Sequence, residues 1–330
     1  MKPFIVAEMS ANHLGSLDRA LQIVAAAAEA GADAIKVQTW TPGTMCVSDY
    51  RLEHGPWAGR QLRGLYEEAF LPWEWHEPIF KAARAAGLEP FSAAFDRESV
   101  DFLETLGVKR HKVASFELTD LPLIRYMASK GKPMILSTGM ATYLEIGAAV
   151  GACSAGSIPF EHITVVKCTS AYPADAADAN LETMGFTGRM HLTEWGLSDH
   201  SLGIGVACAA SALGATYIEK HLTLSRADGG LDAGFSMEPD EFKQMVTECK
   251  RAAAAIGVPS YGPGQNESTE LRRSLWVIKD IAEGEPLIFG ENVRTARPAL
   301  GLHCDAPIDG CRARQDLKAG TPLTPEMVKP

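Results

Sequence analysis

The chain has 330 residues and a formal net charge of −10, and it contains no block of like charge. This charge argues against nucleic acid or an anionic membrane as a partner, while it leaves a small anionic substrate open. The 46% apolar fraction is typical of a globular protein, and the apolar runs are too short to span a bilayer. Seven scattered cysteines without a CxxC pair, and an N-terminus without a signal-peptide core, favour a reduced, cytoplasmic protein.

Short β-prone apolar runs alternate along the chain with longer segments of helical period. We expect strands at 4–8, 34–38, 88–92, 111–115, 133–138, 163–168, 194–199 and 216–221. Helical segments lie at 17–32, 78–87, 101–107 and 205–215, and several end at a glycine, the usual helix stop. Eight such units within residues 1–257 predict an α/β fold, a (β/α)8 TIM barrel. The alternative, a doubly wound open sheet, lacks its GxGxxG fingerprint after the first strand.

A second region follows the expected barrel. Residues 258–273 begin VPSYGPGQNESTE, which is rich in Gly, Pro and Ser and is typical of a linker. The pattern D-[IL]-x-x-G-x-P-L then occurs twice, at 280–287 and at 316–323. We therefore expect a small, mostly-β domain with internal pseudo-repetition over residues 274–330.

Polar side chains gather where the expected strands end. Active sites of (β/α)8 enzymes are built from these C-terminal ends and the loops that follow. A purely structural barrel would carry mostly apolar residues there, so the whole set predicts a catalytic site, although any single residue could be structural. The candidate catalytic and substrate-binding residues are Glu8, Asn12, Lys36, Gln38, Lys112, Ser115, Ser137, Thr169, Ser170, Tyr172, Ser198, His200, Glu219 and His221.

Two of these residues raise the question of a metal. His200, in GLSDHS, and His221, in YIEKH, end neighbouring strands, although a lone histidine of this kind is more often a packed structural residue. Two imidazoles completed by carboxylates and water suit a divalent ion such as Mn²⁺, whereas a third histidine or a thiolate would point to zinc. We expect Asp199 to orient an imidazole. Glu219 is expected either to reach the metal through water or to accept a hydrogen bond from a sugar.

The lysines point to an anionic substrate. Lys36 and Lys112, with serine and threonine hydroxyls and the backbone amides of residues 137–139, suit a phosphate that carries a carboxylate. A lysine in this setting could instead form a Schiff base, as in many barrel aldolases. The residue types alone leave both mechanisms open.

The ordered stretches AEMSANHLGS, GADAIKVQTW, HKVASFE, ILSTGM, KCTSAYP, GLSDHS and IEKH resemble the sialic acid synthase family over nearly the whole chain. VIKDIAEGEPL followed by VRTARPALGLH resembles that family's C-terminal antifreeze-like (SAF) domain. The resemblance implies a barrel that condenses phosphoenolpyruvate with an amino-hexose aldehyde into a nine-carbon 2-keto acid. SANH, TWTPGTM, VASFE and FSMEPDEF resemble the family's pseudaminic acid branch, which implies a 2,4-diacetamido-2,4,6-trideoxy hexose of altrose type. N-acetylneuraminate and legionaminate synthases are the alternatives.

The resemblance also implies roles for single residues. The family's metal ligands, for Mn²⁺ or Mg²⁺, match His200 and His221. The positions that hold phosphoenolpyruvate match Lys36, Lys112, Ser115, Ser137 and Ser198. Sugar-side or acid–base positions match Glu8 and Tyr172. An SAF-domain arginine that reaches into the partner subunit's active site matches Arg297, which implies a domain-swapped homodimer.

The sequence departs from the family pattern at two places. SAAF at 92–95 lacks the usual hydroxyl at Ala93, and NHLG at 12–15 has Leu14 where Asn or Glu is commoner. Ser170 stands where neuraminate synthases often carry Asn, which favours the pseudaminic acid branch. Trp40, Trp57 and Phe235 supply apolar loop side chains that suit methyl and acetamido groups.

Two other classes of function compete with the synthase. A Schiff-base aldolase would need no metal, and borohydride would trap it with its substrate. A non-catalytic carbohydrate- or ice-binding protein would fit the small domain, but it would leave the polar end of the barrel unexplained. Sensitivity to a chelator separates the synthase from both.

Overall fold

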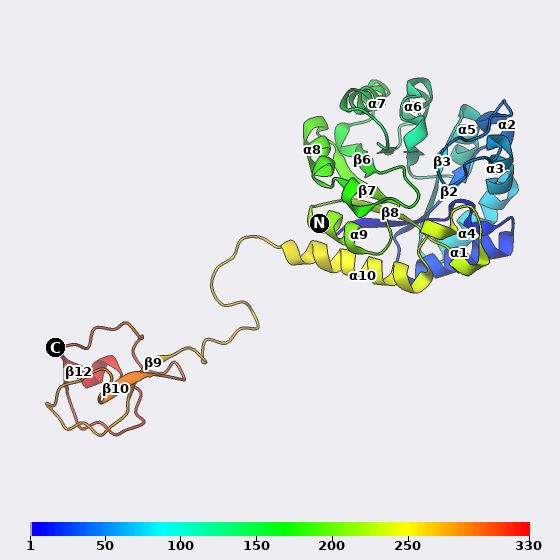
Figure 1. Ribbon diagram of the computed structural model, residues 1–330. Helices are drawn as coiled ribbons and strands as arrows, with labels where there is room; N and C mark the ends of the chain where they lie inside the picture. The colour runs from blue at the N-terminus through cyan, green and yellow to red at the C-terminus, as the bar shows by residue number, and fades with distance from the viewer. Residues whose placement is uncertain (1) are drawn as a thin grey trace. The chain divides into compact units, whose positions relative to one another are not determined.

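The computed structural model describes residues 2–330, and the chain divides into two compact units between Gly257 and Val258. The predicted fold class is confirmed, because β1 to β8 form a closed parallel barrel in sequence order, surrounded by helices (Figure 1). Residues 258–273, which begin the second unit, are exposed throughout. No helix within residues 2–330 has both the length and the apolar character that crossing a membrane requires.

The barrel strands are β1 (Phe4–Glu8), β2 (Ala34–Thr39), β3 (Glu89–Ala94), β4 (His111–Val113), β5 (Met134–Ser137), β6 (Ile163–Cys168), β7 (Glu194–Asp199) and β8 (Tyr217–His221). The helices are α1 (Leu17–Glu29), α2 (Pro42–Met45), α3 (Leu62–Ala69), α4 (His76–Ala85), α5 (Arg97–Thr105), α6 (Leu121–Ala128), α7 (Tyr143–Ala155), α8 (Glu182–His191), α9 (Gly205–Ala212) and α10 (Pro239–Ile256). The C-terminal unit contains β9 (Ser274–Val277), β10 (Val293–Ala296), β11 (Arg312–Ala313) and β12 (Val328–Lys329).

Helix ends follow the local sequence signals. Asp96 accepts a hydrogen bond from the backbone N–H of Ser99 at 2.7 Å, so α5 begins four residues before the segment expected from its apolar pattern. Gly87 and Gly107 follow α4 and α5 with φ of 82° and 67°, a backbone region that glycine enters without steric cost. The expected fourth strand is too long, because β4 stops at Val113 and a 3₁₀ helix begins at Ser115.

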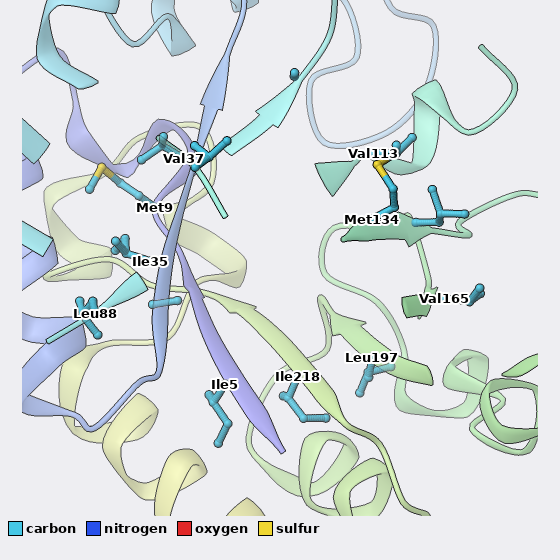
Figure 2. Packing of buried hydrophobic residues seen from close by; sticks show 14 of the residues in the cluster. Ile5, Met9, Ile35, Val37, Leu88, Val113, Met134, Val165, Leu197 and Ile218 are labelled. Carbon is cyan, nitrogen blue, oxygen red and sulfur yellow. The ribbon is translucent and has the colours of Figure 1, made fainter. Parts of the chain in front are cut away.

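The alternation of side chains along each strand sorts them into an outer and an inner layer. The outer layer packs under the helices, and Figure 2 shows Ile5 and Ile218 pointing from neighbouring strands toward those helices. The inner layer is a small apolar plug inside the barrel, formed by Val6, Ala34, Phe91, Ile135, Val166 and Tyr217.

The plug determines which side chains reach the open end of the barrel. Two residues after each plug residue, the same face of the strand presents the next inward side chain. These positions are occupied by Glu8, Lys36, Ala93, Ser137, Cys168 and Glu219. The period of the strands therefore places the polar set directly on top of an apolar floor.

The C-terminal unit is built from the predicted repeat. Ile281 and Leu317 occupy equivalent positions of the two copies, and they exchange backbone hydrogen bonds of 2.9 and 2.8 Å. The aspartate of each copy caps the other copy: Asp280 accepts from the N–H of Ala319, and Asp316 accepts from that of Glu283, both at 2.9 Å. The two copies therefore complete one another around a shared apolar core.

A buried histidine lies between the barrel and α4. His76 is 0% exposed, with Nε2 2.8 Å from the hydroxyl of Thr39 and Nδ1 3.3 Å from the carbonyl of Pro72. A neutral ring satisfies both contacts, since Nδ1–H donates to Pro72 while Nε2 accepts from Thr39. Burial lowers the pKa of His76 from its ordinary value of 6.5 to about 4.

We expect His76 to make the folded protein sensitive to acid. Between pH 6.5 and about 4 the unfolded chain protonates this histidine while the folded chain does not, so stability falls as the pH falls through this range. The loss of unfolding free energy across it should be smaller by about 3 kcal/mol in His76→Gln than in the wild type. Urea unfolding at several pH values measures this difference. The exposed His162→Gln variant is the control, and equal pH dependence in His76→Gln and the wild type would contradict the assignment.

Candidate functional site

Four charged side chains lie on the apolar plug at the carboxyl end of the barrel, and we call Glu8, Lys36, Lys112 and Glu219 the charge cluster. Each is at most 4% exposed. The Lys36 ammonium lies 2.9 Å from Oε2 of Glu8 and 3.4 Å from Oε1 of Glu219. The Lys112 ammonium lies 3.2 Å from Oε2 of Glu219. The cluster thus pairs two positive and two negative charges where little water can reach them.

Burial and pairing act against one another on the pKa values of the cluster. Burial alone would raise the pKa of Glu219, but Lys112 and Lys36 outweigh it and hold that pKa well below its ordinary range. Burial raises the pKa of Glu8, although Lys36 opposes the shift. Burial lowers the pKa of Lys112. Glu219 is therefore the fixed anion of the cluster, and Glu8 is the carboxylate better suited to accept a proton.

The strand register brings His200 and His221 together, as the sequence predicts. Their ring centroids lie 5.3 Å apart, and Glu8 of β1 is in register with His221 of β8. Nδ1 of His200 is 3.0 Å from the carbonyl oxygen of Thr169, which leaves Nε2 of that ring available. A hydrogen bond from one ring nitrogen to a backbone carbonyl is what metal-binding histidines usually make with the nitrogen that does not bind the metal.

A buried ring nitrogen without a partner is a second observation that fits a divalent metal at these two imidazoles. Nδ1 of His221 is buried and has no hydrogen-bond partner among the described residues. Burial, followed by the neighbouring His200, lowers the pKa of His221 well below its ordinary value, so this ring is neutral, as a ligand must be. Among residues 2–330 no group of three or more His, Cys, Asp and Glu is arranged to hold a metal. The two rings would therefore need water or substrate oxygens to complete the coordination.

Hydroxyl groups and a backbone amide form a second polar feature beside the cluster. The N–H of Gly139 donates to Oγ of Ser115 at 3.1 Å. A Cβ atom at Gly139 would lie 2.1 Å from Oγ of Ser170 and 2.8 Å from Oγ of Ser115. The backbone therefore approaches both hydroxyls as only glycine permits, and Ser137 ends the neighbouring strand β5. We call Ser115, Ser137, Gly139 and Ser170 the hydroxyl cradle, a set of donors suited to an oxyanion.

Aromatic rings lie beside the two histidines. The ring of Tyr172 is centred 4.5 Å from that of His200 and 5.0 Å from that of Phe235, and Trp57 continues the series at 5.7 Å from Tyr172. These three residues form an aromatic wall beside His200. Trp40 does not join it, because it is buried and packs edge-on against Phe95.

Two amides connect the loops around the site. Gln38 donates to Oε1 of Glu8 at 2.8 Å and to the hydroxyl of Ser10 at 2.9 Å. Asn12 donates to the carbonyl of Leu222 at 3.0 Å and to the hydroxyl of Ser236 at 2.9 Å, which ties the first loop to the one after β8. Both predicted residues therefore lie at the site, with Asn12 committed to holding loops together.

Three expectations from the sequence need correction or stay open. The hydroxyl of Thr169 donates to the carbonyl of Asp178, and the contact that Thr169 makes with the site is its carbonyl, which faces Nδ1 of His200. Asp199 does not orient an imidazole: it faces the outer side of β7, where it pairs with Lys220 at 2.7 Å. Arg297 is exposed in the C-terminal unit, and its predicted role stays a prediction.

Two buried residues at the site are not among those predicted from the sequence. Cys168 occupies the inward position after Val166, with its sulfur 3.8 Å from Nδ1 of His200, and the two-residue period could have identified it. Asp232 is 8% exposed and accepts a hydrogen bond from the N–H of Ala11 at 3.3 Å. It lies in the loop after β8, where no periodic pattern marks a residue as buried.

Comparisons with known proteins agree with this arrangement. Residues 23–261 match the NeuB family, and residues 272–329 match the SAF domain. The chain is 39% identical to the pseudaminic acid synthase of Campylobacter jejuni, over 98% of this chain and 95% of that protein. It is 35% identical to the N,N'-diacetyllegionaminic acid synthase of Legionella pneumophila, over 100% of this chain and 95% of that protein.

A solved structure supports the same assignment. The N-acetylneuraminic acid synthetase of Leptospira borgpetersenii, crystallised with citrate, is 30% identical with a TM-score of 0.73. The match covers 80% of this chain and 88% of that one. The family predicted from the ordered motifs is therefore confirmed, and the chain belongs to the NeuB family and ends in a SAF domain.

Proposed function

We propose that this protein condenses phosphoenolpyruvate with 2,4-diacetamido-2,4,6-trideoxyaltrose to form pseudaminic acid and inorganic phosphate. The observation that carries the proposal is its identity to a pseudaminic acid synthase, which spans nearly the whole chain and exceeds its identity to a legionaminic acid synthase. Legionaminate and N-acetylneuraminate synthesis are the alternatives within the family.

The proposed reaction forms one carbon–carbon bond, and at carbon 2 of phosphoenolpyruvate it replaces the phosphate oxygen by an oxygen from water. Carbon 3 of phosphoenolpyruvate attacks the aldehyde carbon of the hexose, and the aldehyde oxygen takes up a proton. Water adds to carbon 2 and loses a proton, for which Glu8 is the acceptor, since burial raises its pKa. In the resulting tetrahedral intermediate the bond between carbon 2 and the phosphate oxygen breaks while the new hydroxyl at carbon 2 loses its proton. Phosphate leaves with that proton, and the 2-keto acid remains.

The charge cluster and the hydroxyl cradle support an anionic substrate. Lys36 and Lys112 are held at the open end of the barrel by carboxylates, so their ammonium groups are oriented before substrate arrives. The cradle adds hydroxyl donors, and Ser198 supplies a further hydroxyl at the charge cluster, where it donates to Oε1 of Glu219 at 3.1 Å. Both lysines act as hydrogen-bond donors here, which favours electrostatic binding over the Schiff base of an aldolase.

We propose that His200 and His221 hold the catalytic metal, Mn²⁺ or Mg²⁺. A metal at this position supplies Lewis-acid polarisation of the aldehyde. The proposal is supported by the neutral, unpartnered His221 and by the contact that fixes the His200 ring. The chain's own contribution is to hold both rings at adjacent strand ends, beside the aromatic wall.

The aromatic wall supports the choice of sugar. Trp57, Tyr172 and Phe235 present ring surface where the hexose would lie, which suits a methyl group and acetamido groups better than a triol tail. We place the reaction in the cytoplasm, because the seven cysteines of the protein are free thiols and a reducing compartment keeps thiols from forming disulfides.

We also propose that the working enzyme is a domain-swapped homodimer. The SAF domain is small and its core is limited, so it gains stability by docking on a second surface. Residues 258–273 are fully exposed, as expected of a tether, and Arg297 is exposed beside Pro298. In this proposal Arg297 of the partner subunit contacts the sugar.

A substrate panel tests the reaction. The kcat/KM with phosphoenolpyruvate and the diacetamido altrose should exceed that with N-acetylmannosamine by at least about tenfold, because the aromatic wall favours apolar substituents. The rate of phosphate release gives kcat/KM for each hexose, and mass spectrometry identifies the product. A higher kcat/KM for N-acetylmannosamine would contradict the choice of sugar. Covalent trapping by borohydride with substrate, without phosphate release, would instead support the aldolase.

Loss of either histidine should remove the metal. We expect His200→Ala and His221→Ala to lower bound Mn²⁺ below about 0.1 per chain and turnover by about a thousandfold, since one imidazole cannot hold the ion. Metal content by mass spectrometry and turnover are measured together, with circular dichroism to confirm folding. His162→Ala, an exposed histidine far from the cluster in sequence, is the matched control. Full activity after exhaustive dialysis against EDTA would refute the metal.

Mixed dimers test the shared site. Co-expression of an Arg297→Ala chain with a His200→Ala chain should recover activity, because one site would carry both lesions and the other neither. Each variant alone is the control, and differently tagged chains prove that heterodimers form. Heterodimers without recovered activity would mean that each SAF domain serves its own barrel, and a monomer in solution would equally contradict the proposal.

A further inference from the structure

One residue of the apolar plug carries a polar group. Tyr217 is 2% exposed at the start of β8, and its ring stacks on that of Phe4 at 6.4 Å. Val6, Phe91 and the rest of the plug offer its hydroxyl no partner, since their side chains are apolar. The hydroxyl instead donates a hydrogen bond to Oε2 of Glu219, two residues further along the same face of the strand.

The neighbouring strand leaves space for this tyrosine. Gly196 of β7 is in register with Tyr217, and a Cβ atom at Gly196 would lie 2.4 Å from the carbonyl oxygen and 2.7 Å from Cβ of Tyr217. A side chain at 196 would thus push β8 away at this point. The glycine and the tyrosine form a complementary pair directly below the charge cluster.

Glu219 is the centre of the cluster, and Tyr217 is its donor from the floor of the barrel. Oε1 accepts from Ser198 at 3.1 Å and faces Lys36, while Oε2 accepts from both Lys112 and Tyr217. The Lys112 ammonium also lies 5.6 Å from the centre of the Tyr217 ring, within the range of a cation–π contact. Without the phenol, one carboxylate oxygen would be held only by a lysine that substrate also engages.

We propose that Tyr217 is a positioning residue for phosphoenolpyruvate: its hydroxyl fixes Glu219, and Glu219 in turn holds the Lys36 and Lys112 ammonium groups toward the substrate. This inference rests on the proposed function. It concerns only the anionic substrate, because Tyr217 lies below the lysines and contacts neither histidine of the proposed metal site. The phenol remains a donor, since burial, followed by the charge of Glu219, raises its pKa.

A purely structural tyrosine would behave differently. If Tyr217 only filled the plug, phenylalanine would replace it with a small change in stability and no selective effect on one substrate. If it positions the lysines through Glu219, removal of one hydroxyl should affect the substrate that the lysines bind and leave the other unaffected. The split between the two KM values therefore separates the two roles.

The test is Tyr217→Phe, which keeps the ring and removes the hydroxyl. We expect the KM for phosphoenolpyruvate to rise about tenfold, the KM for the hexose to change less than about twofold, and kcat to fall less than about threefold. Phe91→Leu is the matched control, since it alters the same plug without touching Glu219. It should leave both KM values within about twofold of wild type. Thermal unfolding of both variants checks that they fold.

An unchanged KM for phosphoenolpyruvate in Tyr217→Phe would overturn the inference, and so would equal increases in both KM values or the same increase in Phe91→Leu. A wild-type protein that makes no product from any hexose would contradict the proposed function instead. Calorimetric titration with phosphoenolpyruvate alone then decides the inference. Weaker binding to Tyr217→Phe by about tenfold supports it, and equal binding overturns it.

Discussion

Four buried charges that must be satisfied together govern the active end of this barrel. Taking an ion out of water costs several kcal/mol even after relaxation, and only close partners offset that cost. Glu8, Lys36 and Glu219 come from three consecutive members of the barrel wall, β1, β2 and β8, and Lys112 reaches Glu219 from β4. Each charge depends on the register of a strand, so the closed barrel and its site depend on one another.

This balance changes how the site attracts an anion. The two lysines and two carboxylates sum to zero, so the cluster offers little net positive charge to a substrate that carries a carboxylate and a phosphate. The cluster instead offers ammonium donors that are already desolvated and whose direction is fixed. Such preorganised donors stabilise the charge that develops in a transition state. The hydroxyl cradle adds neutral donors, which leave the net charge of the site unchanged. A bound divalent metal would supply the positive charge that the side chains lack.

Much of the fold could be read from the sequence because parallel strands obey a strict period. β1, β6 and β7 have the expected bounds, and the inward positions after the plug identify Glu8, Lys36 and Glu219. One error comes from adjacency in the sequence rather than from that period. We expect Asp199 to orient the imidazole of the adjacent His200, but neighbouring residues along a strand face opposite sides, and Asp199 pairs instead with Lys220 outside the barrel wall.

Loops were the least predictable part, since tertiary contacts decide their conformation. Thr169 turns its hydroxyl to Asp178, and no local pattern in the sequence indicates that choice. Leu14 takes a left-handed backbone conformation with φ of 49°, which Asn adopts more readily, and its side chain extends to Gly230 in the loop after β8. That departure from the family pattern therefore coincides with a packing contact between two loops of the site.

The reciprocal caps of the C-terminal unit have a consequence for the order in which the newly made chain folds. Asp280 stabilises the turn at Ala319, and Asp316 stabilises the turn at Glu283, so neither copy of the repeat is complete before the other has been synthesised. The barrel needs no residue beyond Gly257 to close its strands. Because domains generally fold as units in the order of their synthesis, the barrel can form while the last turn of the chain is still being made. The small unit can complete its fold only once both copies of the repeat have been synthesised.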